Sequence, residues 1–382
     1  MTRFERVSVS AVTALLALVL AVPTPVRADP ASCQMAIARQ LMRYKKVYLK
    51  AHFRCLRQEN VGRIAGPCPD AVALLKIQTT NQTVVAAVAD ACTMADLAAL
   101  GFPADCAFEA VATGIEGQCA ALQVTTPDEF AECLKCWKGA ELSEFVAILF
   151  ASHANEVCGG SVDATSPRCS ELDCTTPFPA QHDLGSSGDN DCQIGIGRGG
   201  IRYLLKREKT LESCALAGGT RANCLADPAV QIKLTRAEDV KAALIMRRCG
   251  NRVPTADPPF CCRTGTANDC TVQATRADCL TSGGTVQEGK TCNGISLNCD
   301  PVTGPGQPFT WWENCPESAT CPGAALTDVQ GVTDCVDATA DSIIDELLCV
   351  QFPRNGGADW PCPIDTPSPS GAFLDTTHPS LF

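Results

Sequence analysis

Apolar residues in the first third of the chain recur at the spacing of an α-helix. No glycine or proline interrupts residues 31–58, where Ile37, Leu41 and Tyr44 fall three or four positions apart. A second segment, residues 69–91, has a broad apolar face of alanine, leucine and valine. The pattern therefore predicts two long helices, one after the other.

A third helix is predicted from Thr126, a candidate N-cap that is followed by Pro127 in the first turn. Its core face consists of large apolar side chains: Phe130, Leu134, Trp137, Phe145, Ile148 and Leu149. A comparable helix is predicted over residues 327–348. We therefore expect a mainly α protein.

Cysteine spacing indicates two tandem repeats. Cys33 and Cys55 are 22 positions apart, and so are Cys192 and Cys214. Within these stretches the matching residues are Ile37 and Ile196, Arg39 and Arg198, Arg43 and Arg202, Tyr44 and Tyr203. Seven cysteines recur in this order with near-identical spacing. We therefore predict two repeats, each a helical hairpin followed by a third helix.

The second repeat is interrupted by an insertion. Cys106 and Cys119 are 13 positions apart, whereas Cys262 and Cys321 are 59 apart. The extra residues are rich in glycine, threonine, asparagine and cysteine, which predicts a small irregular insert. The predicted organisation is a signal peptide (1–28), repeat 1 (29–158), a linker (159–191), the first part of repeat 2 (192–262), a cysteine-rich insert (263–314), the second part of repeat 2 (315–362) and a mobile tail (363–382).

Residues 1–28 have the three parts of a secretory signal peptide. Arg3 and Arg6 precede an apolar stretch over residues 7–22, and residues 26–28 offer a cleavage site. No later run of 18 apolar residues follows, so no membrane span is expected. We expect a protein secreted to the periplasm or the extracellular space, where cysteines form disulfides.

The composition narrows the class of partner. The chain has 26 cysteines and a formal net charge of −11. Because phosphate binding requires a basic surface, nucleic acid is not expected as a partner. The histidines are scattered and the thiols are expected to be oxidised, so neither a metal nor a cofactor is predicted.

Helix length predicts which cysteines of each hairpin pair. A 22-residue helix spans about 33 Å, so Cys33 and Cys55 lie too far apart to bond. A second helix that folds back antiparallel brings one cysteine to each end of the first. The predicted disulfides are Cys33–Cys92, Cys55–Cys68, Cys192–Cys249 and Cys214–Cys224.

The other cysteines leave more alternatives. The expected pairs are Cys106 with Cys119, Cys133 with Cys158, one of Cys261 and Cys262 with Cys321, and Cys335 with Cys349 or Cys362. Residues 33–174 hold 11 cysteines and residues 192–362 hold 15. Both counts are odd, so complete oxidation requires a disulfide between the halves. We expect it to start from Cys136, which is left over, or from the linker cysteines.

The chain resembles secreted cysteine-rich repeat proteins of environmental bacteria. The resemblance rests on the Cys-Gln-x-x-Ile sequence at Cys33, the paired long helices and the Cys-x-x-Cys sequence at Cys133. The insert, from Cys261 to Cys292, is similar to a short cysteine motif that recurs in bacterial extracellular proteins. The two likenesses cover most of the predicted mature chain. They imply a secreted, disulfide-stapled build and imply no activity.

Two motifs are candidates for chemistry. Cys133 and Cys136 form a C-x-x-C pair, but they fall about two turns into a predicted helix, and Ala338 occupies the matching position of repeat 2. A structural role is favoured over a redox role. Residues 195–200 match G-x-G-x-x-G, but the aligned residues 36–41 are plain helix, so these glycines are expected only to loosen a first helical turn.

Trp311 and Trp312 are the candidate binding residues. They lie beside Phe309 and offer aromatic faces for a sugar or a protein, although covering a small core of the insert is favoured. Many expected disulfides and the lack of a recognised catalytic motif favour a non-enzymatic structural or binding protein. Its partner would be an unknown protein or surface polymer. The alternatives are a thiol–disulfide oxidoreductase using Cys133 and Cys136, or a carrier of a small apolar ligand, which requires a cavity between helices.

Overall fold

The structure is a computed structural model. It describes residues 29–102, 106, 119, 122–151, 188–255, 260–263, 265, 270–271, 276–288, 290–292, 299–301, 308–312, 315, 325–352 and 360. The predicted signal peptide and tail lie outside these residues, as does most of the predicted linker.

The described chain is mainly α-helical, as the apolar pattern predicts. The helices are α2 (Pro30–Glu59), α3 (Ala71–Ala91), α4 (Met94–Ala99), α6 (Pro127–Leu149), α9 (Gly188–Leu216), α10 (Arg221–Ala226), α11 (Pro228–Cys249), α12 (Arg276–Thr281) and α13 (Val329–Gln351). Helix α9 begins a few residues before Cys192, inside the segment predicted as linker.

Side chains just before the helices fix where they begin. Asp29 accepts a hydrogen bond from the Ser32 amide at 2.7 Å, with Pro30 in the first turn of α2. Thr126 forms a capping box with Glu129 at the start of α6. Asp328 caps α13 through the Gly331 amide. These caps satisfy amides that have no partner within the helix.

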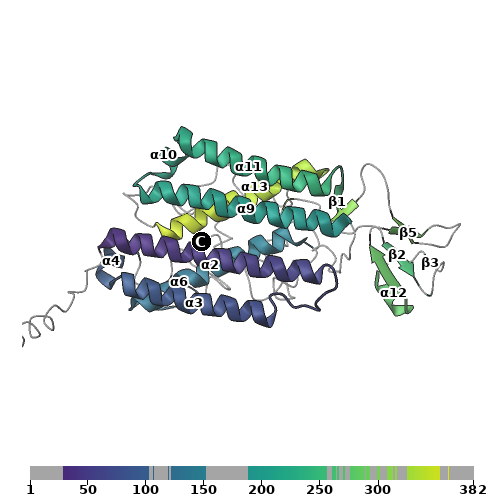
Figure 1. The fold of residues 1–382 in the computed structure, drawn as a ribbon, viewed down its shortest axis with the longest axis horizontal. Coiled ribbons are helices and arrows are strands. Elements are labelled where there is room, and N and C mark those ends of the chain that lie inside the picture. The colour runs from purple at the N-terminus through teal and green to yellow at the C-terminus, as the bar shows by residue number, and fades with distance from the viewer. Residues whose placement is uncertain are drawn as a thin grey trace, which may run out of the picture.

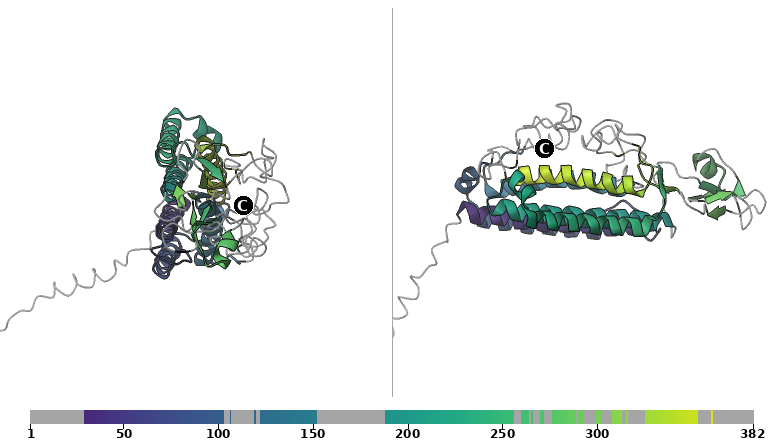
Figure 2. Two further views of the ribbon diagram at one scale, coloured as in Figure 1. Left: turned by 90° about the vertical axis from the view of Figure 1, so that its right-hand side faces the viewer. Right: turned by 90° about the horizontal axis from the view of Figure 1, so that it is seen from above.

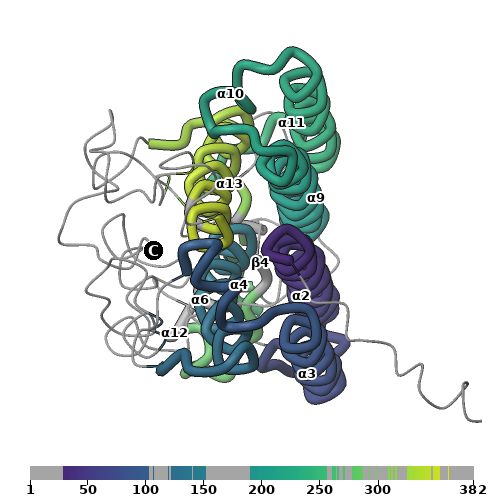
Figure 3. Tube along the Cα trace, turned by 90° about the vertical axis from the view of Figure 1, so that its left-hand side faces the viewer, coloured from purple at the N-terminus to yellow at the C-terminus, as the bar shows by residue number. Residues whose placement is uncertain are grey.

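The long helices form two layers. Helices α3, α2, α9 and α11 lie side by side in that order, and α6 and α13 cover one face of this row (Figures 1 and 3). The two-layer arrangement is also clear from above (Figure 2). Helix α4 follows the end of α3, α10 follows the end of α9, and both lie at the same end of the bundle (Figure 1). Helices α2 and α9 are therefore antiparallel.

Disulfides join both ends of each hairpin. They are Cys33–Cys92, Cys55–Cys68, Cys192–Cys249 and Cys214–Cys224, with Cα separations of 4.8, 5.6, 4.3 and 5.8 Å. These are the four pairings that helix length predicts. Each bond between distant positions lowers the conformational entropy of the unfolded chain. In the chain-entropy account this stabilises the folded state by about 3 kcal/mol or more.

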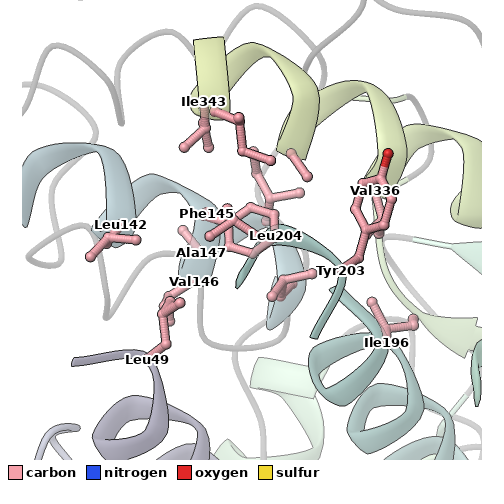
Figure 4. Close-up of a cluster of buried hydrophobic side chains, with 14 of the residues drawn as sticks. Leu49, Leu142, Phe145, Val146, Ala147, Ile196, Tyr203, Leu204, Val336 and Ile343 are labelled. Carbon is pink, nitrogen blue, oxygen red and sulfur yellow. The ribbon is translucent and has the colours of Figure 1, made fainter. Parts of the chain in front are cut away.

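The apolar core lies between the two layers. Phe145 and Val146 of α6, Leu204 of α9 and Ile343 of α13 meet there, and none of these side chains is exposed to solvent (Figure 4). Leu49 brings α2 into the same cluster (Figure 4). The core is therefore continuous across both predicted repeats.

Two glutamines link the halves reciprocally. Gln34 of α2 donates to the backbone carbonyl of Gln351, at the end of α13. Gln193 of α9 donates to the backbone carbonyl of Leu149, at the end of α6. Gln34 and Gln193 each follow the first cysteine of a predicted repeat. The first helix of each half thus contacts the third helix of the other.

Short strands lie between α11 and α13 in the sequence. Strands β1 and β7 contact the long helices, whereas β2, β3 and β5 lie beyond one end of the bundle (Figure 1). They are β1 (Val253–Thr255), β2 (Phe260–Arg263), β3 (Cys270–Thr271), β4 (Thr285–Glu288), β5 (Lys290–Cys292), β6 (Cys299–Pro301) and β7 (Pro308–Thr310). Strands β1 and β7 pair in parallel, β2 pairs antiparallel with β3 and β4, and β5 pairs antiparallel with β6. The insert, predicted to be irregular, thus contains paired strands.

Candidate binding site

Cys133 and Cys136 do not form a redox pair. Cys133 bonds to Cys106, and Cys136 bonds to Cys119. Both sulfurs therefore staple α6 to the segment that precedes it, and the fully buried Cys133 is closed to a substrate. The oxidoreductase hypothesis required a thiol pair that opens and closes, so these bonds overturn it. The predicted Cys106–Cys119 and Cys133–Cys158 pairs were wrong.

The pairing of the insert also differs from the prediction. Cys261–Cys299, Cys262–Cys279 and Cys270–Cys292 close the insert on itself. Cys315 bonds to Cys335, so the predicted bond of Cys335 to Cys349 or Cys362 was wrong. Cys315, and not Cys261 or Cys262, takes the place that Cys106 has in the first half. Cys136 does not join the halves, because Cys119 is its partner. No cysteine is free among the described residues.

Three cysteine sulfurs of the insert lie close together but are not a metal site. The sulfurs of Cys261, Cys270 and Cys292 all lie within 4.8 Å of one another. Each is oxidised in a disulfide, whereas a metal ligand must be a thiolate. The cluster is therefore a packed disulfide core.

Trp311 and Trp312 are buried, which excludes them as an exposed binding surface. Neither side chain is accessible to solvent. The Trp312 indole donates to the carbonyl of Ile148 on α6 at 3.1 Å. Both tryptophans belong to the core of the helical bundle and not to a core of the insert. They attach the end of the insert to the bundle.

The glycines of residues 195–200 permit close helix packing. A Cβ atom at Gly197 would lie 2.5 Å from the Phe150 ring, and one at Gly195 would lie 2.6 Å from Cβ of Arg248. The motif is in the second turn of α9 and beyond, so it does not serve to loosen the first turn. It lets α9 approach α11 and the end of α6.

The open site lies in a groove between α2 and α9. This groove has a volume of about 660 Å³, within the range typical of ligand pockets. Its apolar lining consists of Met35, Ala38, Met42 and Val47 from α2 and Leu216 from α9. Its charged lining consists of Arg39, Arg43, Lys46 and Lys209, together with the single carboxylate of Glu212.

The cations of this groove follow helical spacing. Arg39, Arg43 and Lys46 are four and three positions apart on α2, so they share one exposed face. Lys209 projects from α9 on the other side. The net charge of −11 gives no indication of this basic face. In the sequence, it is indicated by the spacing of the basic residues along residues 31–58.

The groove lies at one end of the α2–α9 contact, and three of its lining residues differ from those aligned with them at the other end. Glu212, Lys46 and Met42 line it. The residues that the predicted repeat places opposite them, at the other end of the contact, are Phe53, Leu205 and Ile201. These three pack against the core, and Phe53 lies edge-on to Phe150 with ring centroids 5.8 Å apart. Large apolar groups thus occupy the far end, whereas two of the three near-end residues, Lys46 and Glu212, are charged.

Buried charges lie directly behind the groove. Glu212, almost fully buried, accepts a hydrogen bond from the Gln351 side chain at 2.6 Å. Lys45 forms an ion pair with Glu208, and neither side chain is exposed. Lys138 of α6 donates to the backbone carbonyl of Leu347. The α2–α9 contact thus has an ionic interior at this end.

Burial changes the proton affinity of both lysines. Burial lowers the pKa of Lys45 to about 8, with the carboxylate of Glu212 opposing the shift. Burial, and next the charge of Lys45, lower the pKa of Lys138 well below its usual value. Lys45 therefore remains mostly protonated at neutral pH and can pair with Glu208.

No helix in the described part of the chain is long and apolar enough to cross a bilayer. Comparison with known proteins gives no relative: no family model, no curated protein and no solved structure matches the chain. The site is therefore interpreted from its own geometry.

Proposed function

We propose that the protein is a secreted, non-enzymatic binding protein whose α2–α9 groove takes an anion with an aliphatic portion. The observation that carries the proposal is the lining of the groove. Four cations surround an apolar floor in a chain whose net charge is −11. Such a site attracts a carboxylate or phosphate at its rim and removes an alkyl chain from water.

The covalent framework supports this proposal over a catalytic one. The described cysteines are closed in disulfides, and the C-x-x-C pair is locked to two other cysteines. Rigid walls reduce the ordering cost of binding, which favours a preformed groove. The groove also gives the carrier hypothesis a specific location, although its cationic rim favours an anionic amphiphile over a neutral one.

The test is titration calorimetry with dodecanoate and with dodecanol as the neutral probe. We expect dodecanoate to bind and dodecanol to bind at least tenfold more weakly. Lys209→Gln should weaken dodecanoate binding by about tenfold, because a charge-assisted contact contributes about 1.5–3 kcal/mol.

Lys50 provides the matched control. It is exposed, it is a lysine, and the predicted repeat aligns it with Lys209 at the far end of the α2–α9 contact. Lys50→Gln should leave dodecanoate binding unchanged. Equal losses from the two variants, or no binding of dodecanoate to the wild-type protein, would reject the groove as the binding site and favour a purely structural role.

A further inference from the structure

A second groove, between α9 and α11, is strongly basic. Its volume is about 410 Å³. Arg202 and Lys206 line it from α9, and Lys233 and Arg236 line it from α11. No carboxylate is among its described lining residues. Arg202, Lys206 and the Lys209 of the first groove are four and three positions apart on α9, so both grooves open on the same helical face.

Large aliphatic side chains project beside these cations. Ile232 is 71% exposed and Val240 is 42% exposed, and both line the groove. Single exposed aliphatic residues are ordinary on a protein surface. Here two of them lie within one turn of Lys233 or Arg236 on the same helix, which combines an apolar and a cationic surface.

The aligned surface of the first half, formed by α2 and α3, has fewer cations. The predicted repeat aligns Arg236 with Thr79, Lys206 with Val47, and Ile232 with Leu75. Leu75 is 64% exposed on α3, so the first half keeps the exposed aliphatic residue without two of the four cations. The second half therefore carries a surface that the first half lacks.

We propose that the α9–α11 groove docks the protein on an anionic lipid bilayer. A bilayer interface offers negative headgroups to the four cations and, just below them, acyl chains to Ile232 and Val240. A polysaccharide or nucleic acid satisfies only the charges and leaves the aliphatic side chains in water. Both requirements are met together by the membrane surface.

Sedimentation with lipid vesicles tests this docking. The protein should bind vesicles of phosphatidylcholine that contain about 30% phosphatidylglycerol, and should bind pure phosphatidylcholine at least tenfold more weakly. Salt at about 1 M, where the screening length is about 3 Å, should release most of the bound protein.

Two variants separate charge from insertion. Arg236→Glu should weaken binding to the anionic vesicles by at least tenfold. Ile232→Asn should also weaken it several-fold, whereas the matched control Leu75→Asn should have no effect. Far-UV circular dichroism checks that each variant is folded.

The outcomes are distinct. Equal binding to neutral and anionic vesicles, or no binding to either, would overturn the proposal. So would binding that Arg236→Glu weakens and Ile232→Asn leaves unchanged, because that result identifies a general polyanion surface. The residues tested do not line the α2–α9 groove, so Ile232→Asn should retain dodecanoate binding, and each proposal can fail without the other.

Discussion

Lys45 and Glu208 meet at the contact of α2 and α9, where water does not reach either side chain. The predicted repeat aligns Lys45 with Leu204 and Glu208 with Leu49, and both leucines are fully buried. The same contact is therefore made once with an ion pair and once with two aliphatic residues. A buried ion pair contributes little net stability, because its desolvation cost is close to its Coulomb attraction.

The first prediction concerns this ion pair. Lys45→Leu alone should lower the free energy of unfolding by about 3–5 kcal/mol, because it leaves Glu208 buried without its partner. The double variant Lys45→Leu with Glu208→Leu should recover most of this loss. Urea unfolding of the oxidised proteins measures both. If the double variant were as unstable as the single one, two leucines could not replace the ion pair as Leu204 and Leu49 do at the aligned positions.

The second prediction concerns Lys138 and pH. Its pKa in the folded protein lies well below 10.5, so in the interval between the two values the unfolded chain binds more protons. Stability should therefore rise as the pH increases through that interval. Lys138→Met should reduce this rise, of which Lys45 retains a part because burial lowers its pKa to about 8, and should stabilise the protein at neutral pH. Urea midpoints at about pH 7 and about pH 9.5 measure how stability changes with pH. The same change in the wild type and the variant would contradict the prediction.

At the scale of single residues, the sequence revealed the cysteine pairing of the hairpins but not the site. Cys33 and Cys92 pair because helix length leaves one geometry open. Glu212 gave no such signal, since its role depends on which residue of another helix faces it. Net charge also did not indicate the candidate site, because it sums the charges of a basic face and of an acidic remainder of the chain.

The glycines of α9 allow it to pack closely against its neighbours, and the third prediction follows from this packing. Gly197→Ala should destabilise the protein by about 1–3 kcal/mol through overpacking against Phe150, although alanine is the better helix former by about 1 kcal/mol. Gly331→Ala is the matched control in α13, where the nearest atom to an added Cβ is 3.4 Å away. It should not lose stability. Thermal unfolding compares the two, and equal effects would contradict the packing argument.

Helix positions were predictable, whereas the stapling of the third helix was not. The start of α6 follows from the predicted cap Thr126, and α13 starts within two residues of the predicted position 327. Cys133 and Cys136 are three positions apart and so share one helix face, which both bonds use. The predicted pairs of Cys106 with Cys119 and of Cys133 with Cys158 did not take into account that two cysteines on one helix face can both bond to the same neighbouring segment.

For the whole molecule, cysteine parity gives the fourth prediction. The described bonds use eight cysteines up to Cys136 and twelve from Cys192 to Cys335, each within its own half. Three cysteines remain on each side: Cys158, Cys169 and Cys174, and Cys321, Cys349 and Cys362. Cys349 is itself in a disulfide.

Complete oxidation therefore still requires a bond between the halves. We expect peptide mapping of the unreduced protein to find a disulfide that joins a cysteine of residues 158–174 to one of residues 321–362. We also expect thiol titration of the unfolded, unreduced protein to find no reactive thiol. Two reactive thiols per chain would contradict the prediction.

The reciprocal glutamines have a consequence for how the contact between the halves depends on protein concentration. Each half supplies one donor and one acceptor to the other, through Gln34 and Gln351 and through Gln193 and Leu149. This is the contact pattern of an isologous dimer, in which the same patch of each subunit serves both. A dimer of separate chains dissociates when its concentration falls below its dissociation constant. Because both halves belong to one chain, their effective concentration is fixed by the linker and does not fall on dilution.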